Sequence, residues 1–210
     1  KEELMNRKVE KTEPDMIASG LYNYLLFGEK SQYLDRLPLK EIKKLKSEEL
    51  VSICKDALQY KSDIFYVGQN TADEVAEQLK QNCMFLTNVK IEGKGFEGPD
   101  YSKFEKNQVY FINNERSKQS KLFLFINQDK VAPEERPLAE AFNMYFGGGF
   151  SGLVLQEIRE YRSMAYSAGA RFRLPEHKDH NSIFMGYVGT QCDKTLDALK
   201  IFNGLIRDMP

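Results

Sequence analysis

The sequence predicts an α+β fold in which helices cover an antiparallel sheet. Two observations carry this prediction. Apolar residues recur at helical spacing in several separate segments, and in the C-terminal half three runs have the length and composition of strands, at 121–126, 165–172 and 182–190. One polar stretch separates the last two runs, so we expect them to form a hairpin with a long loop. A mixture of helices and adjacent strands is typical of the α+β class.

The N-terminal segments are predicted to form helix, helix, strand and helix in that order. Helical spacing between a proline and a glycine indicates a first helix at 14–27. A second helix is expected at 47–60, where the hydroxyl of Ser47 can accept from the free amides of the first turn. The run 63–67 then predicts a buried strand, and residues 71–74 form a capping box that opens a third helix.

A connector separates these elements from a second group. Between residues 89 and 116 the periodicity fades among glycines and scattered charges. After the strand at 121–126 we expect a helix at 133–146, three glycines, another helix at 151–162, the hairpin, and a last helix that opens at Asp193. We therefore predict a domain boundary within this connector.

The composition is that of an ordinary globular protein. Of 210 residues, 41% are hydrophobic and 29% are charged, and the net charge is −1. This charge argues against a surface for polyanions, so nucleic acid is not an expected partner. No apolar run approaches the length of a membrane span. The chain begins at Lys1 without an initiator methionine, and we expect it to be part of a longer protein.

The three cysteines, Cys54, Cys83 and Cys192, are widely spaced along the chain. This pattern indicates neither a disulfide framework nor a metal clip. We expect core thiols, because Cys54 in particular shares a helical face with Val51 and Leu58.

The histidines are the first candidates for chemistry, and there are only two, His177 and His180. A zinc ion needs three or four protein ligands, whereas this pair offers two, in a polar loop with no cysteine nearby. A solvated hairpin loop is the favoured interpretation, and an independent metal site is the alternative. The sequence also contains neither a Gly-x-Ser-x-Gly nucleophile elbow nor a Gly-x-x-x-x-Gly-Lys phosphate loop. We therefore expect no catalytic centre and no metal site in this chain alone.

The glycine run Gly147, Gly148 and Gly149 admits two interpretations. It could cradle a phosphate, because it precedes a helix whose free amides attract anions. No lysine follows it and no strand precedes it, however, and the phosphate-binding motifs require both. The favoured interpretation is a flexible joint between two helices, with Gly147 ending the first helix in a left-handed conformation.

Two arginines, Arg159 and Arg162, stand on one side of the helix that follows. At α-helical spacing Glu157 and Glu160 face neither of them, so neither arginine is expected to have a local partner. They are either solvated surface residues or, with Tyr166, the edge of a peptide-binding site, because guanidinium and phenol can donate to carbonyls or carboxylates. Both interpretations stay open at this point.

The stretch Tyr145-Phe-Gly-Gly-Gly-Phe-Ser-Gly-Leu-Val-Leu-Gln-Glu-Ile-Arg-Glu160, followed by Tyr161-Arg-Ser-Met-Ala-Tyr166-Ser-Ala168, resembles a signature of pitrilysin/insulinase-type peptidases. Their pattern is a glycine pair or triplet, an amphipathic helix ending in Leu/Ile-Arg-Glu, and then Gly-Leu-Ala-Tyr-Ser. Ser163 and Met164 stand here where Gly-Leu is usual. Residues 22–31 and 50–68 also look like segments of that family, so the resemblance covers most of the chain.

The resemblance implies a fold like that of the mitochondrial processing peptidase, built from homologous α+β domains that close around a chamber. In that family the first domain carries the zinc motif His-x-x-Glu-His, which is absent between Lys1 and Pro210. The chain therefore resembles an inactive domain that binds no cofactor, with zinc expected in the catalytic half of the protein. Whether Glu2, Glu3 or Glu10 descends from a zinc-ligating position stays open.

The expected partners follow from the same resemblance. They are the catalytic zinc-binding half, in the same protein or in a partner subunit, and a peptide substrate. The compartment stays open, with the bacterial cytoplasm and periplasm as the candidates. The alternative function is that of a catalytically dead structural or assembly subunit of the same superfamily.

The resemblance also implies the site residues. In the family the non-catalytic half contributes an arginine and a tyrosine seven residues apart that reach toward the bound peptide. Arg159 and Tyr166 match that spacing and context. The glycines 147–149 are similar to the longer glycine-rich loop of non-catalytic subunits of the processing peptidase. In the alternative function, Arg159 would be only a surface or interface charge.

The family frame divides the chain into two incomplete halves. Residues 1–88 look like the later half of one peptidase domain, 89–116 like a connector, and 117–210 like the earlier half of the next domain. Because the domains of the family are homologous, we expect the halves to complement each other in one compact unit. In that arrangement the strands 63–67 and 121–126 would share a core.

Overall fold

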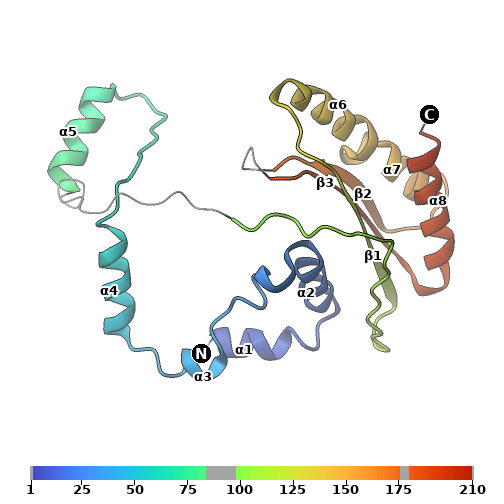
Figure 1. Cartoon of the computed structure of the whole chain (residues 1–210), viewed down its shortest axis with the longest axis horizontal. Helices are drawn as coiled ribbons and strands as arrows, with labels where there is room; N and C mark the ends of the chain where they lie inside the picture. The colour runs from blue at the N-terminus through green and yellow to red at the C-terminus, as the bar shows by residue number, and fades with distance from the viewer. Residues whose placement is uncertain (1, 84–97, 176–179, 210) are drawn as a thin grey trace. The chain divides into compact units, whose positions relative to one another are not determined.

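The computed structural model describes residues 2–83, 98–175 and 180–209. The chain forms two compact units, one made of residues 1–36 and 99–210 and the other of residues 37–98. Figure 1 labels the helices and strands of both units. Each unit is described by itself below.

A three-stranded antiparallel sheet lies in the first unit. Its strands are β1 (Gln119–Asn127), β2 (Ser167–Arg173) and β3 (Ile183–Gln191), in the order β1-β3-β2. Both outer strands pair antiparallel with β3. The predicted α+β class with an antiparallel sheet is therefore confirmed, and each observed strand lies within two residues of its predicted bounds.

Side chains of β3 alternate between the two faces of the sheet, as the period of two in a strand requires. Phe184 and Val188 belong to the buried apolar cluster beneath the C-terminal helices. Met185 and Tyr187 lie on the opposite face, where Tyr187 stacks against Phe123 of β1 with ring centroids 5.3 Å apart. Both faces of the sheet are thus covered by other parts of the first unit.

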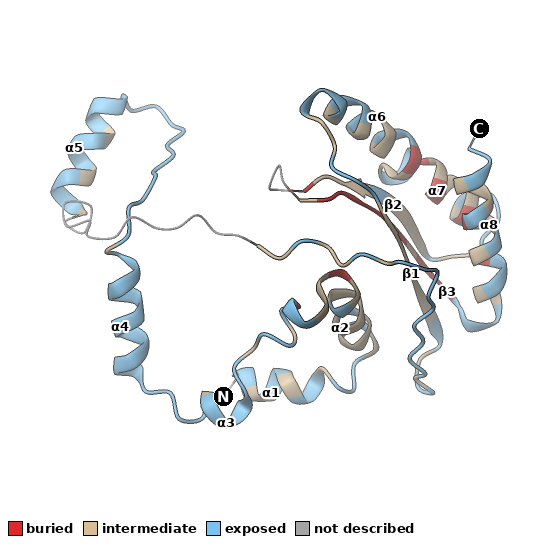
Figure 2. Cartoon of the chain, viewed as in Figure 1, coloured by how far each residue is buried: buried red, intermediate tan, exposed pale blue. Residues whose placement is uncertain are grey.

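Three helices cover one face of the sheet, as Figure 1 shows. They are α6 (Arg136–Gly147), the single turn α7 (Leu153–Leu155) and α8 (Thr195–Arg207). Short 3-10 turns precede each of them, at Pro133–Glu135, Gly149–Ser151 and Cys192–Lys194. The buried core between these helices and the sheet consists of Phe146, Val154, Ile158, Phe184, Val188, Ala198 and Phe202. Figure 2 shows this core in red.

Close approach of α8 to the sheet depends on a glycine in the central strand. A Cβ atom on Gly186 would lie 2.3 Å from the ring of Phe202, a distance that real contacts do not reach. The missing side chain therefore makes room for Phe202, the one aromatic residue of α8, and burial of that ring stabilises the layer.

The helix α2 (Pro14–Phe27) packs on the other face of the sheet, after the short helix α1 (Glu2–Val9). The ring of Tyr22 lies 5.3 Å from that of Phe123 and 5.4 Å from that of Phe125. Its hydroxyl lies 3.3 Å from the sulfur of Met185 on β3. The N-terminal helices therefore belong to the same packed body as the C-terminal sheet.

The second unit contains α3 (Leu39–Ile42), α4 (Ser47–Ala57) and α5 (Ala72–Asn82). The predicted capping box is confirmed, because Thr71 accepts from the amide of Glu74 and Glu74 accepts from the amide of Thr71. Of the residues that the structure describes between 37 and 98, none is buried. In Figure 2 this unit is almost entirely pale blue.

Two predictions for this unit are wrong. Residues 61–67 form neither helix nor strand, and Phe65 and Val67 are almost fully exposed. A strand is stable only beside a hydrogen-bonded neighbour, and the described part of this unit offers helices instead. Cys54 is exposed rather than buried, because nothing in the described part of its unit covers the apolar face of α4.

Two smaller features complete the comparison with the predicted elements. Residues 98–118 contain no helix or strand, as expected of a connector, whereas 84–97 lie outside the described residues. The helix α4 begins at Ser47, as predicted. The serine hydroxyl donates to the carboxylate of Glu48 at 3.0 Å, however, and the carboxylate of Glu49 accepts from the amide of Lys46 at 3.1 Å. No helix within the described ranges is both long and apolar enough to cross a membrane.

Candidate functional site

The candidate site lies on a segment that leaves the core through a π-helical turn. After α7, residues Gln156–Glu160 form this turn, in which the amide of Tyr161 donates to the carbonyl of Gln156, five residues earlier, at 2.9 Å. Val154 and Ile158 are fully buried and fix the segment against the sheet. Arg159, the residue after the second of these anchors, is half-buried and its side chain reaches the surface.

Two hydrogen bonds close the turn that follows and end the helix. The amide of Ser163 donates to the carbonyl of Arg159, four residues earlier, and the amide of Met164 donates to the carbonyl of Ile158, six residues earlier, both at 2.9 Å. Each bond spans one residue more than its counterpart in a Schellman motif. Ser163 has a φ of 49° and is the one non-glycine residue with positive φ in the described ranges. The family pattern has Gly-Leu where this chain has Ser163-Met164, and the geometry explains why glycine suits the position.

The structure brings Arg159 and Tyr166 together. The guanidinium carbon of Arg159 lies 5.9 Å from the centroid of the Tyr166 ring, within the range of a cation–π contact. Arg159 Nε also lies 3.4 Å from a carboxylate oxygen of its neighbour Glu160. The Tyr166 side chain is 77% exposed, while its amide donates to the carbonyl of Gly189 on β3 at 2.9 Å. The result is a cationic group stacked on an exposed phenol.

The prediction that neither arginine has a local partner is wrong. Arg162 forms an ion pair with Glu157, and its guanidinium donates to the Glu157 carbonyl at 2.9 Å. The reason is the π-helical turn, which aligns residues five apart, whereas the prediction assumed the α-helical neighbours at three and four. Arg162 is therefore occupied within its own turn, and Arg159 is the arginine that stacks on the exposed ring.

The glycines 147–149 form a tight joint between α6 and the following turn. A Cβ on Gly147 would lie 1.6 Å from the carbonyl oxygen of Ala170 on β2, and a Cβ on Gly148 would lie 2.4 Å from the carbonyl oxygen of Met144. Gly147 is thus required by close packing, and the predicted left-handed backbone is not found there. Positive φ occurs at Gly149 instead, at 58°, because α6 continues through Gly147.

Exposed aromatic side chains surround this stretch in the sequence. They are Tyr145, Phe150, Tyr161 and Tyr166, all at least half exposed. Burial of a Phe or Tyr is normally favourable, so exposed rings next to an arginine are typical of binding surfaces. Sequence reasoning identified Tyr166 but missed Phe150, for which the glycine run on its N-terminal side was the available signal.

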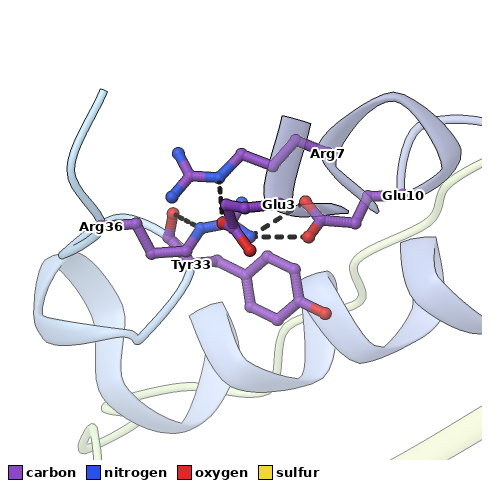
Figure 3. Close-up of polar contacts among 5 residues, drawn as sticks. All are labelled: Glu3, Arg7, Glu10, Tyr33 and Arg36. Atoms are coloured by element: carbon purple, nitrogen blue, oxygen red, sulfur yellow. Dashed lines mark hydrogen bonds and ion pairs between the residues drawn. The ribbon is translucent and has the colours of Figure 1, made fainter. Parts of the chain in front are cut away.

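Two acidic residues near the N-terminus, Glu3 in α1 and Glu10 directly after it, form structural ion pairs, as Figure 3 shows. Glu3 binds Arg7 at 2.7 Å, and Glu10 binds Arg36 through both carboxylate oxygens at 2.8 and 3.0 Å. The hydrogen bond from Arg36 lowers the pKa of Glu10 below its usual 4.5. The guanidinium of Arg36 lies 4.6 Å from the ring of Tyr33. These contacts clip α1 to the turn after α2, and they give Glu3 and Glu10 structural partners.

The residues described here do not fit a zinc site. His177 lies outside them, and the described ranges contain no group of three or more His, Cys, Asp or Glu side chains that could hold a metal ion.

A separate apolar cavity of about 540 Å³ opens between α6 and the end of the sheet. Its walls include Phe142, Phe146, Phe172 and Phe184. None of the predicted site residues, Arg159, Tyr166 and Gly147 to Gly149, lines this cavity. The cavity and the Arg159–Tyr166 pair are thus distinct features of the first unit.

Comparison with known protein families gives a match over most of the chain. A family model described as the peptidase M16 inactive domain matches residues 61–209, which is well over half of the chain. No curated protein sequence matches the chain.

Two solved structures have similar folds. One is a peptidase M16 inactive domain from Pseudomonas fluorescens, with a TM-score of 0.61 and 19% identity, covering 97% of this chain and 49% of that chain. The other is a protease from Helicobacter pylori, with a TM-score of 0.56 and 12% identity, covering 82% of this chain and 42% of that chain. At these identities the likeness shows the fold, and the chain spans about half the length of the proteins it matches.

The family match over residues 61–209 and the fold shared with the solved structures agree with each other. The chain belongs to the pitrilysin/insulinase-type M16 peptidase family and corresponds to its inactive domain.

Proposed function

We propose that this chain is the non-catalytic part of a zinc metallopeptidase and that it helps to bind the peptide substrate and to enclose the chamber. Arg159 and Tyr166 are the residues that assist. The catalytic, zinc-binding half is expected in the same protein or in a partner subunit. The observation that carries this proposal is the stacked arrangement of the two side chains, with the guanidinium 5.9 Å from an exposed ring.

The chemistry of the pair suits a peptide ligand. A guanidinium offers five N–H donors and a phenol offers one O–H donor, so both can bind a backbone carbonyl or a carboxylate. Stacking on Tyr166 restricts the guanidinium of Arg159, which lowers the conformational entropy lost when a ligand binds. The nearby carboxylate of Glu160 is at 3.4 Å, a loose contact that leaves donors of the guanidinium for a ligand.

The glycine run supports the same role through its backbone. A Cβ built on Gly149 would meet nothing within 4 Å, so this residue borders open space. Positive φ at Gly149 exposes a backbone that a peptide can approach closely. The glycines 147–149 therefore serve, in this proposal, as a second peptide contact beside the Arg159–Tyr166 pair.

The test is replacement of Arg159 by alanine in the full-length enzyme. Loss of a charge-assisted hydrogen bond removes roughly 1.5–3 kcal/mol, so kcat/KM should fall about 10- to 100-fold. Zinc content should be unchanged, because the arginine is not a ligand. The matched control is Arg162→Ala, which removes an arginine that is paired with Glu157 in the same turn and should keep near wild-type rates.

The alternative, a catalytically dead assembly subunit, is favoured by a different observation. Large apolar side chains of the second unit are exposed, among them Leu50, Val51 and Ile53 on α4. Such faces mark surfaces that other proteins or domains cover. A zinc motif in the full-length sequence together with a strong effect of Arg159→Ala would exclude this alternative, whereas wild-type rates from that variant would favour it.

The domain division is part of the same proposal. Residues 1–88 correspond to the later half of one peptidase domain and residues 117–210 to the earlier half of the next, with 89–116 between them. Packing of α2 against the sheet supports complementation of the two halves for the N-terminal helices. Limited proteolysis of the full-length protein tests the division, since cleavage should be confined to the connector if the halves are packed.

A further inference from the structure

The turn between Arg159 and Tyr166 has to hold a backbone conformation that its sequence disfavours. Ser163 has a φ of 49°, and the left-handed region costs a non-glycine residue about 1–2 kcal/mol. Such a residue keeps its conformation only when surrounding contacts determine it. Two of these contacts are the hydrogen bonds from the amides of Ser163 and Met164 to the carbonyls of Arg159 and Ile158 in the preceding turn.

The sheet supplies the next contact, from a residue that sequence reasoning did not single out. The hydroxyl of Thr190 donates to the carbonyl of Met164. Thr190 is only 2% exposed and pairs with Ser120 of β1, but it lies one residue beyond the point where β2 pairs with β3. Its side chain therefore binds the residues before β2 to the central strand β3 at a point where the backbone pairing of β2 with β3 has ended.

The next link joins this contact to Tyr166. The amide of Tyr166 donates to the carbonyl of Gly189, the residue before Thr190 in β3. Gly189 and Thr190, which are consecutive in β3, thus bind Tyr166 and Met164. Ala165 is the one residue between those two. Loss of the Thr190 hydroxyl would leave the carbonyl of the half-buried Met164 without this donor and would free the segment between Ser163 and β2.

We propose that Thr190 is a positioning residue: through the carbonyl of Met164 it holds the turn that sets the Tyr166 ring against the Arg159 guanidinium. This inference rests on the proposed function for its consequence in catalysis. The geometry of the pair can be tested without any activity. Thr190 itself is buried and touches no ligand in this account.

The experiment uses a tryptophan reporter, because the chain contains no tryptophan. Tyr166→Trp introduces one exposed indole at the site, and its time-resolved fluorescence anisotropy reports nanosecond motion of that side chain. Thr190→Val removes the hydroxyl at nearly constant shape, and Thr190→Ser keeps it. We expect the fast-motion amplitude of the indole to rise about two-fold in the valine variant and to stay unchanged in the serine variant.

Unchanged motion in a folded Thr190→Val variant would overturn the proposal, and so would equal mobilisation by valine and serine. If the valine variant fails to fold, Thr190→Ala takes its place, because the smaller side chain leaves room for a water to bind the Met164 carbonyl. The same result is then expected from alanine, and an immobile indole would again refute the role.

Kinetics in the full-length enzyme separate this inference from the proposed function. If the proposed function and the positioning role of Thr190 both hold, Thr190→Val should lower kcat/KM and Thr190→Ser should keep it near the wild-type value. If Arg159→Ala shows wild-type rates while Thr190→Val mobilises the indole, the proposed function fails and the positioning role stands. If Arg159→Ala is impaired while the valine variant leaves the indole fixed and the rates normal, the positioning role fails alone.

Discussion

In the unit of residues 1–36 and 99–210, apolar side chains of the sheet and the helices bury one another, whereas none of the described apolar side chains of residues 37–98 is buried. Phe202 of α8 is 2% exposed, and Ile53 of α4 is 62% exposed. Both residues lie on amphipathic helices of similar length. The difference between them therefore does not come from the helices themselves.

The comparison teaches that an apolar helical face predicts burial only when a partner surface exists. The helix α8 finds that surface in β3, where Gly186 leaves space for its aromatic ring. The helix α4 has no such surface in the described part of its unit. Most of the apolar residues of α4 and of 64–67 are therefore exposed in the described part of their own unit.

The largest expected effect separates the two units directly. Phe202→Ala should lower the free energy of unfolding by about 3–5 kcal/mol, because it leaves a cavity beneath α8. Its matched control, Ile53→Ala, removes an exposed side chain and should change stability by less than about 0.5 kcal/mol. Urea unfolding followed by far-UV circular dichroism measures both. A large loss from Ile53→Ala in the isolated chain would break the comparison.

A smaller effect is expected at the edge of the sheet. The side chain of Asn143 on α6 both donates to and accepts from the backbone of Phe172 on the outer strand β2, at 2.8 and 2.6 Å. Asn143→Ala leaves these groups unpaired and should cost roughly 2 kcal/mol. Asn82, at the end of α5, donates to the carbonyl of Gln78 in solvent. Asn82→Ala should cost much less, and equal thermal shifts for the two variants would contradict this account.

The next effect has the opposite sign. Ser163→Gly should raise stability by about 0.5–1 kcal/mol, because relief of the left-handed backbone exceeds the extra entropy that glycine has when unfolded. Ser163→Ala keeps the Cβ atom and should have little effect. Thermal unfolding of the three proteins side by side measures the difference. A lower melting temperature for the glycine variant would show that the turn is not strained.

The smallest effect depends on pH. Arg36 lowers the pKa of Glu10 in the folded state, so the pair adds stability above the unfolded pKa of about 4.5, and this stability is lost as the pH falls through the folded value. The contribution should be about 0.5–1 kcal/mol for a pair that is partly exposed. Glu10→Gln should remove this pH dependence below 4.5. The exposed pair of Glu41 and Lys44 in the second unit provides the control, since Glu41→Gln should change stability less.

Much of the sheet could be predicted from local sequence. The apolar runs at 121–126 and 182–190 form strands as predicted, since they pair with each other within the same unit. The run 63–67 has a similar composition but no strand beside it in the described part of its unit. Local preference is equal in these cases, and the neighbour decides the outcome.

The candidate site was predicted less completely, because its helix contains a π-helical turn whose residue spacing the prediction did not include. Resemblance identified Arg159 and Tyr166, and the structure finds them in contact. The π-helical turn could not be predicted from apolar periodicity, because Val154 and Ile158 keep α-helical spacing although Ile158 lies within that turn. Thr190 gave no signal at all, because a threonine in a strand is ordinary and its bond to Met164 depends on tertiary structure.

The most direct test of the central claim, that Arg159 and Tyr166 act as one peptide-binding unit, is a double-mutant cycle in the full-length enzyme. The variants are Arg159→Ala, Tyr166→Ala and the double variant, and the measured quantity is kcat/KM for one peptide. We predict that the double variant loses about as much as Arg159→Ala alone, with a loss of about 10- to 100-fold. Wild-type rates for all three variants, or two losses that simply multiply, would contradict the claim.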